Sequence, residues 1–570
     1  MSLGMLWFRC LRRVAGHPLF WLGIPVLIYL PTVTGPFTFD DLMLVVRSED
    51  YASGQTPELK LFCFGGTEED SRKLRDVGTF PWWAPAGRIC FFRPLAQCSF
   101  YLDMLLFGRN PLGHKLVSLA WFALALFCLH RLCATVCGDS VRAGTAAFFY
   151  GISQAVAQPA TFVGNRADLL VVVGVSIAAT AYWKATLRQR RWLILVAAAG
   201  YAFALLSKEM AIGMAGAVVL HEIIARRRRG PAPVSATAVA IVVAVMAVIY
   251  MAYFVATRPW QFGLGGDQAP SNVSFLAGAP KAVLLYLAVW VLGFQTDVLM
   301  LLKAGPNLVL AIGLLGLCVA VVVARYVARM ARKDSGTLFF TLWALSFLLV
   351  GLLTSPAPRV LCVATIGWAY LVAGLLTAPA EDRATSPLWL RRWLLTTSGA
   401  VNILCGLGTV LTQDRLELQM RANLAEYIAA QPRALQAGDA LIVAEAQDPL
   451  ELVLMPERVQ YTTGLSDVSV SFLTPPGAAG CVERQDDHTL IFGSQGADLL
   501  DEKLYKLTQG RDEKRRVGQT FATRDFVAEI RDVGGDGRVT SLAFHFHDPL
   551  TSERLHFYPP DLAMIAQGDR

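Results

Sequence analysis

Apolar runs of about twenty residues recur along this chain between Leu19 and Leu411, and short clusters of Arg and Lys separate them. A helix of that length crosses the hydrocarbon core of a bilayer, so the pattern predicts a membrane-embedded protein. Hydrophobic residues make up 54% of the 570 residues and charged residues only 17%. The mean hydropathy of +0.46 is also well above that of an ordinary soluble domain.

The net charge of +7 comes from basic clusters between apolar runs, as in cytoplasmic loops. This distribution excludes nucleic acid as a partner and predicts contact with membrane lipid. Arg12 and Arg13 precede the first run and no small-residue cleavage site follows it, so this run is expected to remain as an anchor. Arg226 to Arg229 mark another cytoplasmic end, most simply as a topological anchor.

The apolar segment 281–301 is the one run that does not fit an alternating path. If it crossed fully, the basic residues between 325 and 333 would lie outside, so we interpret it as interfacial or re-entrant. The prediction is then a polytopic α-helical membrane protein with the N-terminus inside and the C-terminus outside. Its about eleven transmembrane helices are expected near residues 19–35, 112–136, 141–163, 166–184, 192–207, 209–225, 234–256, 306–328, 337–354, 359–378 and 393–411.

A long outer loop, residues 36–111, is predicted between the first two spans. Its aromatic clusters, Pro81-Trp82-Trp83 and Phe91-Phe92, are typical of amphipathic helices lying in the membrane interface. Most of the eleven Cys residues lie in apolar runs and act as small hydrophobic residues. Cys63 and Cys90 are the candidates for a disulfide in an oxidising compartment.

The pattern changes after residue 411, where we place the boundary between a membrane domain, 1–411, and a soluble α/β domain, 412–570. Leu416, Met420, Leu424 and Ile428 recur at helical spacing. Residues 440–443 are typical of a buried strand, and Gly534-Gly535-Asp536-Gly537 lies between two apolar stretches as in a β-hairpin.

Ionisable residues gather at the turns that this topology places outside. They are Asp40, Asp41, Arg93, Arg166, Asp168, Lys208, Glu209 and Arg359. Carboxylates and cations on one side of a membrane are typical of a reaction site rather than a pore.

The chemistry that these residue types favour is displacement at a carbon bearing a phosphate leaving group. A carboxylate would take the proton of an acceptor hydroxyl, and Arg or Lys would hold the departing phosphate. Two alternatives stay open: Asp40 and Asp41 could form a solvated helix end, and the Arg166–Asp168 and Lys208–Glu209 turns could be plain salt bridges. Arg359 follows a Pro-rich turn, 355–358, where an isolated arginine breaks the inside bias.

The motifs occur in an order that resembles the GT-C glycosyltransferases, over about residues 20–411. The likeness is nearest to the membrane part of the transmembrane O-mannosyltransferases with tetratricopeptide repeats and to their bacterial relatives. The matching segments are 37–41 (FTFDD), 92–95 (FRPL), 107–117 (FGRNPLGHKLV), 165–170 (NRADLL), 206–209 (LSKE) and 358–361 (PRVL).

This resemblance implies that the chain takes a sugar from a polyprenyl-phosphate donor and transfers it to a glycan, lipid or protein acceptor. It implies a catalytic base, and a ligand for a divalent cation if one is used, at Asp40 or Asp41. It implies donor-phosphate binding by Arg166, Lys208 and Arg359. Arg93, His114, Gln158, Asp168 and Glu209 would support the site, and the compartment would be the periplasmic face of a bacterial inner membrane.

The chain departs from the family pattern before the Arg-Ala-Asp turn. Where eukaryotic members tend to have His-Pro and His-Thr-Glu, this chain reads Ser153-Gln154 and Val156-Ala157-Gln158. The resemblance therefore carries over neither a carboxylate ligand at Gln158 nor mannose as the sugar. No repeat of 34 residues occurs, so it does not carry over a protein acceptor of those relatives either.

Two other functional classes are the alternatives: a transporter or flippase of lipid-linked sugars, and a membrane anchor for the terminal domain. A transporter would show inverted repeats and ionisable groups near the midplane, and the sequence has neither pattern. His221-Glu222 is expected to be a helix-packing pair, because the second His of a zinc helix is lacking. His545 and His547 are expected on a half-exposed strand face, and the sequon 272–274 to arise by chance.

Overall fold

Two compact units make up the chain in the computed structural model. It describes residues 18–38, 40–52, 61–64, 68–84, 89–229, 233–257, 279–292, 306–353, 358–377, 388–448, 451–465, 467–478, 480–494, 496–500 and 515–568. The first unit comprises residues up to 37, 91–262 and 271–413, and the second comprises 38–90, 263–270 and 414–570. Part of the predicted outer loop, 38–90, thus groups with the terminal residues.

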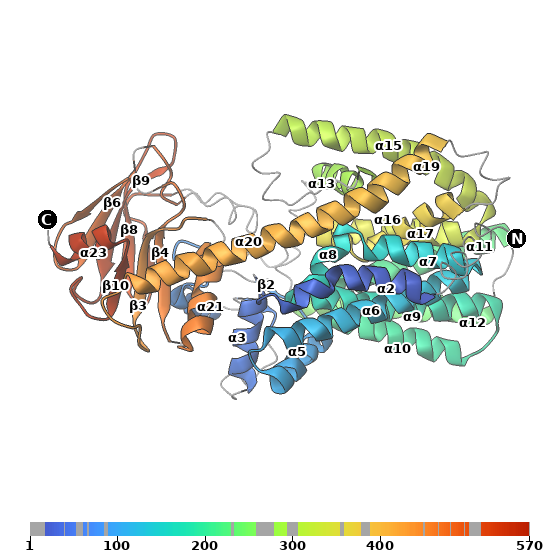
Figure 1. The fold of residues 1–570 in the computed structure, drawn as a ribbon, viewed down its shortest axis with the longest axis horizontal. Helices are drawn as coiled ribbons and strands as arrows, with labels where there is room; N and C mark the ends of the chain where they lie inside the picture. Colours follow the sequence, from blue (N-terminus) through green and yellow to red (C-terminus); the bar gives the residue numbers. More distant parts are fainter. Residues whose placement is uncertain are drawn as a thin grey trace, which may run out of the picture. The chain divides into compact units, whose positions relative to one another are not determined.

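All regular secondary structure among the described residues of the first unit is helical (Figure 1). Its elements are α2 (Pro18–Tyr29), η1 (Leu30–Thr34), α5 (Pro94–Phe107), α6 (Pro111–Cys137), α7 (Ser140–Gly151), α8 (Gln154–Thr161), η2 (Val163–Asn165), α9 (Arg166–Leu187), α10 (Trp192–Ser207), η3 (Glu209–Ile212), α11 (Gly213–Arg229), α12 (Val234–Thr257), α13 (Ala279–Leu287), η6 (Ala288–Leu292), α15 (Pro306–Lys333), α16 (Ser335–Gly351), η7 (Pro358–Leu361), α17 (Ala364–Thr377), α19 (Leu388–Leu395), η8 (Thr396–Val401) and α20 (Asn402–Ala429).

The chain is an integral membrane protein. Among the described residues, five helices are long and apolar enough to span a bilayer: Pro111–Cys137, Val163–Leu187, Val234–Thr257, Leu310–Lys333 and Leu388–Ala429. Large apolar side chains such as Leu195 and Leu349 are exposed on the helices, as lipid contact requires. Shorter apolar helices occupy other predicted spans, and the number of eleven crossings stays a prediction.

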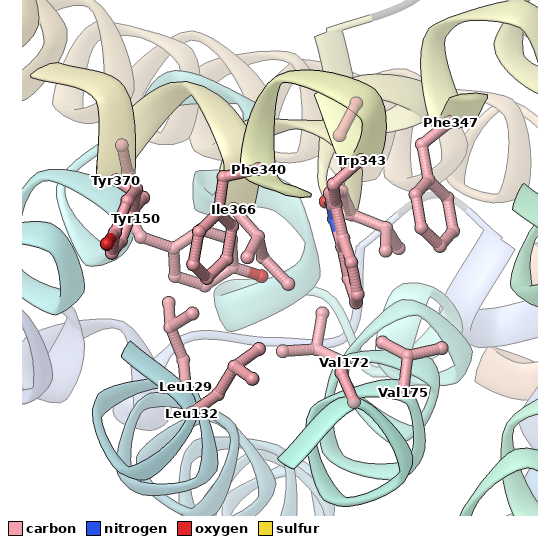
Figure 2. Packing of buried hydrophobic residues seen from close by; sticks show 14 of the residues in the cluster. Leu129, Leu132, Tyr150, Val172, Val175, Phe340, Trp343, Phe347, Ile366 and Tyr370 are labelled. Carbon is pink, nitrogen blue, oxygen red and sulfur yellow. The ribbon is translucent and has the colours of Figure 1, made fainter. Parts of the chain in front are cut away.

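The core of the first unit combines aromatic side chains with close helix approaches. Figure 2 shows Phe340, Trp343 and Phe347 of α16 facing residues of α6 and α9. The Trp343 indole donates to the carbonyl of Val363 at 2.9 Å, so its buried N–H is satisfied. Gly174 of α9 lies against α10, where an added Cβ would come within 2.6 Å of the Gly200 carbonyl oxygen. Such small residues let the helix backbones pack directly.

Two predicted spans and the predicted re-entrant segment differ from simple helices. The span 141–163 is broken between α7 and α8, where the Ser153 side chain accepts from the Ala155 N–H. Segment 281–301 forms α13 and the π-helical turn η6 as far as Leu292, and its remainder lies outside the described residues. Helix α20 continues to Ala429 without a break, so the predicted boundary at 411 falls inside one helix.

The second unit contains three sheets among its described residues, and the part of α20 from Asp414 onward also belongs to it. The elements are α3 (Asp40–Ala52), β1 (Cys63–Phe64), α4 (Glu68–Val77), β2 (Ile89–Cys90), β3 (Ala440–Glu445), α21 (Glu451–Thr463), β4 (Ser469–Thr474), β5 (Cys481–Arg484), β6 (Thr489–Gly493), β7 (Thr520–Ala522), β8 (Phe526–Val533), β9 (Val539–Phe546), β10 (Leu555–Tyr558) and α23 (Pro560–Gln567). Strands β10, β3 and β4 form a parallel sheet in that order, and β5-β6-β9-β8-β7 form an antiparallel sheet. The predicted strand at 440–443 and the 526–547 hairpin are both confirmed.

The aromatic pair Trp82-Trp83 was predicted to lie in the membrane interface, and this prediction is wrong. Both side chains are only 2% exposed and pack in the core of the second unit. The Trp82 indole donates to the carbonyl of Phe472 on β4 at 3.0 Å. Gly78, with φ +93°, lets the end of α4 approach β4, because a Cβ there would overlap the Val470 carbonyl.

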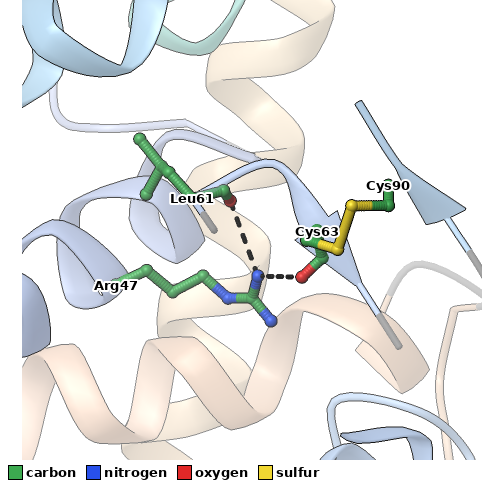
Figure 3. Close-up of a disulfide and its surroundings, with 4 residues drawn as sticks. All are labelled: Arg47, Leu61, Cys63 and Cys90. Carbon is green, nitrogen blue, oxygen red and sulfur yellow. Dashed lines mark hydrogen bonds between the residues drawn. A yellow bond between two sulfur atoms is a disulfide. The ribbon is translucent and has the colours of Figure 1, made fainter. Parts of the chain in front are cut away.

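The predicted disulfide between Cys63 and Cys90 is present (Figure 3). The two residues are paired in the short antiparallel ladder of β1 and β2. The Arg47 side chain of α3 donates to the Cys63 carbonyl at 2.8 Å, which ties this ladder to the helix that begins at Asp40.

Candidate functional site

Six residues from four distant parts of the sequence meet through side-chain contacts in the first unit. We call them the turn cluster: Arg93, Asn165, Asp168, Lys208, Glu209 and Arg359. All lie at the ends of helices or in the turns between them. These four turns are thus in side-chain contact within the first unit, and their role in binding or catalysis stays a prediction.

The two acidic members of the turn cluster are each paired with a cation. Arg93 donates to both carboxylate oxygens of Glu209, at 3.0 and 2.5 Å. Lys208 donates to both oxygens of Asp168, at 2.8 Å each. Lys208 and Glu209 are neighbours on one turn, but each pairs with another segment. The alternative of a plain salt bridge between Lys208 and Glu209 is therefore wrong.

Arg359 is the charged member of the turn cluster that has no ion-pair partner among the described residues, and we call such a charge open. Its guanidinium, on the turn η7, donates to the Asn165 side chain at 3.2 Å. Among the residues that the structure describes, no carboxylate lies within ion-pair distance of it. Because a guanidinium has five N–H donors and this one hydrogen bond uses one of them, Arg359 retains donors for an anion.

Arg166 has a different environment from the one predicted. Its side chain is 0% exposed, forms an ion pair with Asp103 of α5, and lies 5.1 Å from the ring centroid of Phe100. It also donates to Ser118 at 3.0 Å and to the His114 carbonyl at 2.7 Å. These contacts join α5, α6 and α9. The ion pair with Asp103 already neutralises the charge of Arg166. We therefore do not assign Arg166 to the donor phosphate.

Asp103 is the residue of this region that the sequence analysis missed. It lies in α5, outside every quoted motif, and only 3% of its side chain is exposed. The signal that would have found it is physical, since a fully buried arginine needs a buried carboxylate.

His114 and Gln158 are placed beside these residues. A His114 ring nitrogen lies 2.8 Å from the Gly108 carbonyl oxygen, and the other lies 3.6 Å from Asp103. His114 therefore supports the Arg166–Asp103 pair instead of facing a ligand. Gln158 is half-buried on α8, and α8 packs against the turn η7 that carries Arg359.

The acidic pair at 40–41 belongs to the second unit, and its two members differ. Asp41 is 1% exposed, and its carboxylate accepts from the backbone N–H and the hydroxyl of Thr38, at 3.3 Å each. Asp41 thus makes one of the two bonds of a capping box at the start of α3, so the alternative of a helix end applies to it. Asp40 is exposed, and its carboxylate makes no hydrogen bond with the residues that the structure describes. Phe39, between Thr38 and Asp40, lies outside the described residues.

Asp40 has an acidic neighbour within the second unit. Burial raises the pKa of Glu457 on α21, and the Asp40 charge adds to that shift, while a hydrogen bond from Thr79 opposes it. One carboxylate oxygen of Glu457 has no hydrogen-bond partner among the described residues. Two carboxyl groups thus influence each other beside the start of α3.

A metal site does not emerge from the described parts of the chain, where no group of three or more His, Cys, Asp or Glu is arranged to hold an ion. His221 is part of a packing network with Tyr182 and Ser335, as predicted. His545 lies on a half-exposed strand face beside Glu529, also as predicted. The sequon at 272–274 lies outside the described residues.

Comparisons with known proteins give structural likenesses only. No family model and no curated protein matches the chain. The archaeal oligosaccharyltransferase AglB from Archaeoglobus fulgidus, in complex with an inhibitory peptide and a dolichol-phosphate, matches 77% of this chain at 14% identity with a TM-score of 0.43. A structure of the oligosaccharyltransferase of that organism with Zn and sulfate matches 79% at 13% identity with a TM-score of 0.44. The chain spans 63% and 62% of the lengths of these two proteins.

ArnT from Cupriavidus metallidurans, bound to undecaprenyl phosphate, matches 79% of this chain and 89% of its own length, at 15% identity with a TM-score of 0.41. At such TM-scores and identities, the likenesses say nothing about which residues bind or react. The site therefore rests on this chain's own contacts. The assignment to the GT-C glycosyltransferases therefore stays a prediction from the order of the motifs.

Proposed function

We propose that this protein is a membrane glycosyltransferase that moves a sugar from a polyprenyl-phosphate donor to an acceptor hydroxyl. The observation that carries the proposal is the open guanidinium of Arg359 within a cluster whose other described charges are paired. An arginine can hold two phosphate oxygens in a planar fork, which suits a departing phosphate.

The other cations of the turn cluster have supporting roles in this proposal. Lys208 is 14% exposed and bound to Asp168, so it can add positive charge without being the sole anchor. Arg93 and Glu209 fix the turn that carries Lys208. As the sugar leaves, negative charge grows on the phosphate, and charges that are already positioned stabilise it without reorganisation.

Asp40 is the carboxylate that we assign as general base. The resemblance places the base at 40 or 41, and Asp41 is engaged in capping α3, whereas Asp40 is exposed. In the reaction, the acceptor oxygen forms a bond to the anomeric carbon and the bond from that carbon to the phosphate oxygen breaks. The phosphate keeps the bonding electron pair, and the hydroxyl proton passes to Asp40.

The proposed compartment is the periplasm of a bacterium, with the turn cluster and the second unit on that side of the inner membrane. The Cys63–Cys90 disulfide supports this orientation, because such bonds persist in oxidising compartments. A divalent cation at the acidic pair is part of the proposal as an option. It is tested by adding a chelator and then restoring Mg²⁺, Mn²⁺ or Zn²⁺.

The test uses the purified full chain in proteoliposomes with a panel of polyprenyl-phosphate sugars and with glycan, lipid and protein acceptor fractions. We expect wild type to release polyprenyl phosphate and to label one fraction. Asp40→Asn should slow release by about two to four orders of magnitude, the usual worth of a general base. The control is Glu69→Gln, an exposed carboxylate of the same unit, which should keep full activity.

Donor that crosses the bilayer uncleaved would contradict the proposal and support the flippase alternative. Full activity in Asp40→Asn would place the base elsewhere.

A further inference from the structure

A second charged site lies at the far end of α11 from the turn cluster. There, a cavity of about 430 Å³ opens where α11 and α15 end and α16 begins. Its lining is Ala225, Arg228, Arg332, Lys333, Ser335 and Leu338. Nothing in the proposed transfer reaction uses these residues.

Among the described residues, the lining holds basic side chains and no carboxylate. Within the described residues, neither Arg228, Arg332 nor Lys333 forms an ion pair with an acidic group. Asp334 is their neighbour in sequence, but its carboxylate caps α16 by accepting from Gly336 and Thr337 and lies 3.5 Å from Arg142. The described lining of the cavity therefore carries positive charge that no described carboxylate compensates.

The walls of the cavity are fixed by hydrogen bonds. Arg228 donates to the Ala331 carbonyl at 2.8 Å, which joins the end of α11 to the last turn of α15. The Ser335 hydroxyl lies 3.0 Å from one ring nitrogen of His221, and the other ring nitrogen lies 2.8 Å from the Tyr182 hydroxyl. Tyr182 in turn donates to Glu222 at 3.1 Å. These hydrogen bonds hold the residues around the three cations in place without using a ligand.

An exposed apolar face continues from the cavity along α16. Leu345 and Leu349 are 52% and 65% exposed. They lie seven and eleven residues after Leu338, which puts all three on one side of the helix. A ligand whose anionic head occupies the cavity can therefore lay an apolar chain against the same helix.

We propose that this cavity binds the phosphate of an anionic membrane lipid. The three cations supply charge-assisted hydrogen bonds to the phosphate oxygens, and the exposed leucines of α16 contact the acyl chains. A free phosphate would satisfy the cations equally well but would leave the apolar face unused. The site is separate from the donor site, and it stands whether or not the chain transfers sugars.

The test measures lipid binding to the purified full chain in detergent by native mass spectrometry, with phosphatidylglycerol and zwitterionic phosphatidylcholine as probes. Removing the two cations of α15 with Arg332→Gln/Lys333→Gln should weaken phosphatidylglycerol binding by about thirtyfold. The matched control, Arg325→Gln/Arg329→Gln, removes two exposed cations of the same helix outside the cavity and should change binding little.

Equal loss in the cavity variant and in the control would overturn the site, since only the general surface charge would matter. Equal affinity for phosphatidylcholine would overturn the requirement for a net anionic lipid. Displacement of bound phosphatidylglycerol by inorganic phosphate would overturn the assignment to a lipid. Retention of the lipid against inorganic phosphate supports it.

Discussion

The charged residues near the two ends of α11 differ in whether they form ion pairs. At its start, the acidic residues of the turn cluster pair with cations from other segments, as in Arg93–Glu209 and Lys208–Asp168. At its end, Arg228 and the α15 cations line a cavity whose described residues include no carboxylate. Paired charges hold turns in place, whereas an open charge in a fixed wall is available to a ligand. By this criterion Arg359 belongs with the open charges, although it lies among the paired ones.

The second unit offers an acidic counterpart. Glu417 and Arg458 are both buried and paired at 2.5 and 2.7 Å, whereas Glu457, the neighbour of Arg458 in sequence, has an oxygen without a described partner. In this unit too, buried groups that are paired stabilise the fold. A buried oxygen without a partner costs stability and marks a candidate for function.

The largest expected effect comes from breaking the most buried pair. Arg166→Gln leaves Asp103 charged and buried, and the loss should be about 3–5 kcal/mol of unfolding free energy. Arg359→Gln should cost less than about 1 kcal/mol, because it removes no ion pair. Both are measured by denaturant unfolding of the full chain in detergent.

A double variant controls for the loss of Arg166. Arg166→Met/Asp103→Leu replaces the pair by apolar groups and should recover most of the stability. Equal destabilisation by Arg166→Gln and Arg359→Gln would break the distinction between paired and open charges.

A smaller effect should separate the two adjacent aspartates. Asp41→Ala removes the capping contact to Thr38 and should cost about 1 kcal/mol. Asp40→Ala should change stability by less than about 0.5 kcal/mol, as for other exposed positions. The measurement is the unfolding midpoint of each variant. The opposite order would reverse our assignment of the cap and the base.

The smallest predicted effect is a pH dependence at Glu457. Because its folded pKa is raised above the ordinary 4.5, the folded state favours the protonated carboxyl. Stability should therefore fall as pH rises from about 4.5 through the folded pKa, and it should stay lower at neutral pH. Glu457→Gln lacks this dependence, so it should be more stable than wild type near neutral pH.

The difference between wild type and Glu457→Gln should shrink as the pH falls toward 4.5. Thermal unfolding of both proteins across that range measures it. A constant difference would mean that Glu457 is ionised in the folded state throughout.

Much of the helical framework could be predicted because its signal is local. The run at 234–256 became α12, Val234–Thr257, since hydropathy alone defines a span that faces lipid. The predicted boundary at 411 lies two residues from the division of the chain into its two units after Gln413, and both points fall inside α20, because apolarity ends there while the helix continues. Trp82 and Trp83 were misassigned because their partners on β4 and β8 lie hundreds of residues away.

The candidate site was predictable where turns carry motifs, as at Lys208-Glu209 and Pro358-Arg359. The pairing of these charges could not be predicted, because each charge pairs with a residue of another segment. Glu209 binds Arg93, and Lys208 binds Asp168. The pair of Arg166 with Asp103 could not be predicted for the same reason, since Asp103 lies outside every motif.

The most direct test of the open charge at Arg359 is the affinity for polyprenyl phosphate, the proposed leaving group. It is best measured by native mass spectrometry in chains that already carry Arg332→Gln/Lys333→Gln, so that the cavity cannot contribute. In that background Arg359→Gln should weaken binding about ten- to a hundredfold, and Arg359→Lys should recover only part of it. The control Arg325→Gln should have no effect. Unchanged affinity in Arg359→Gln would contradict the account.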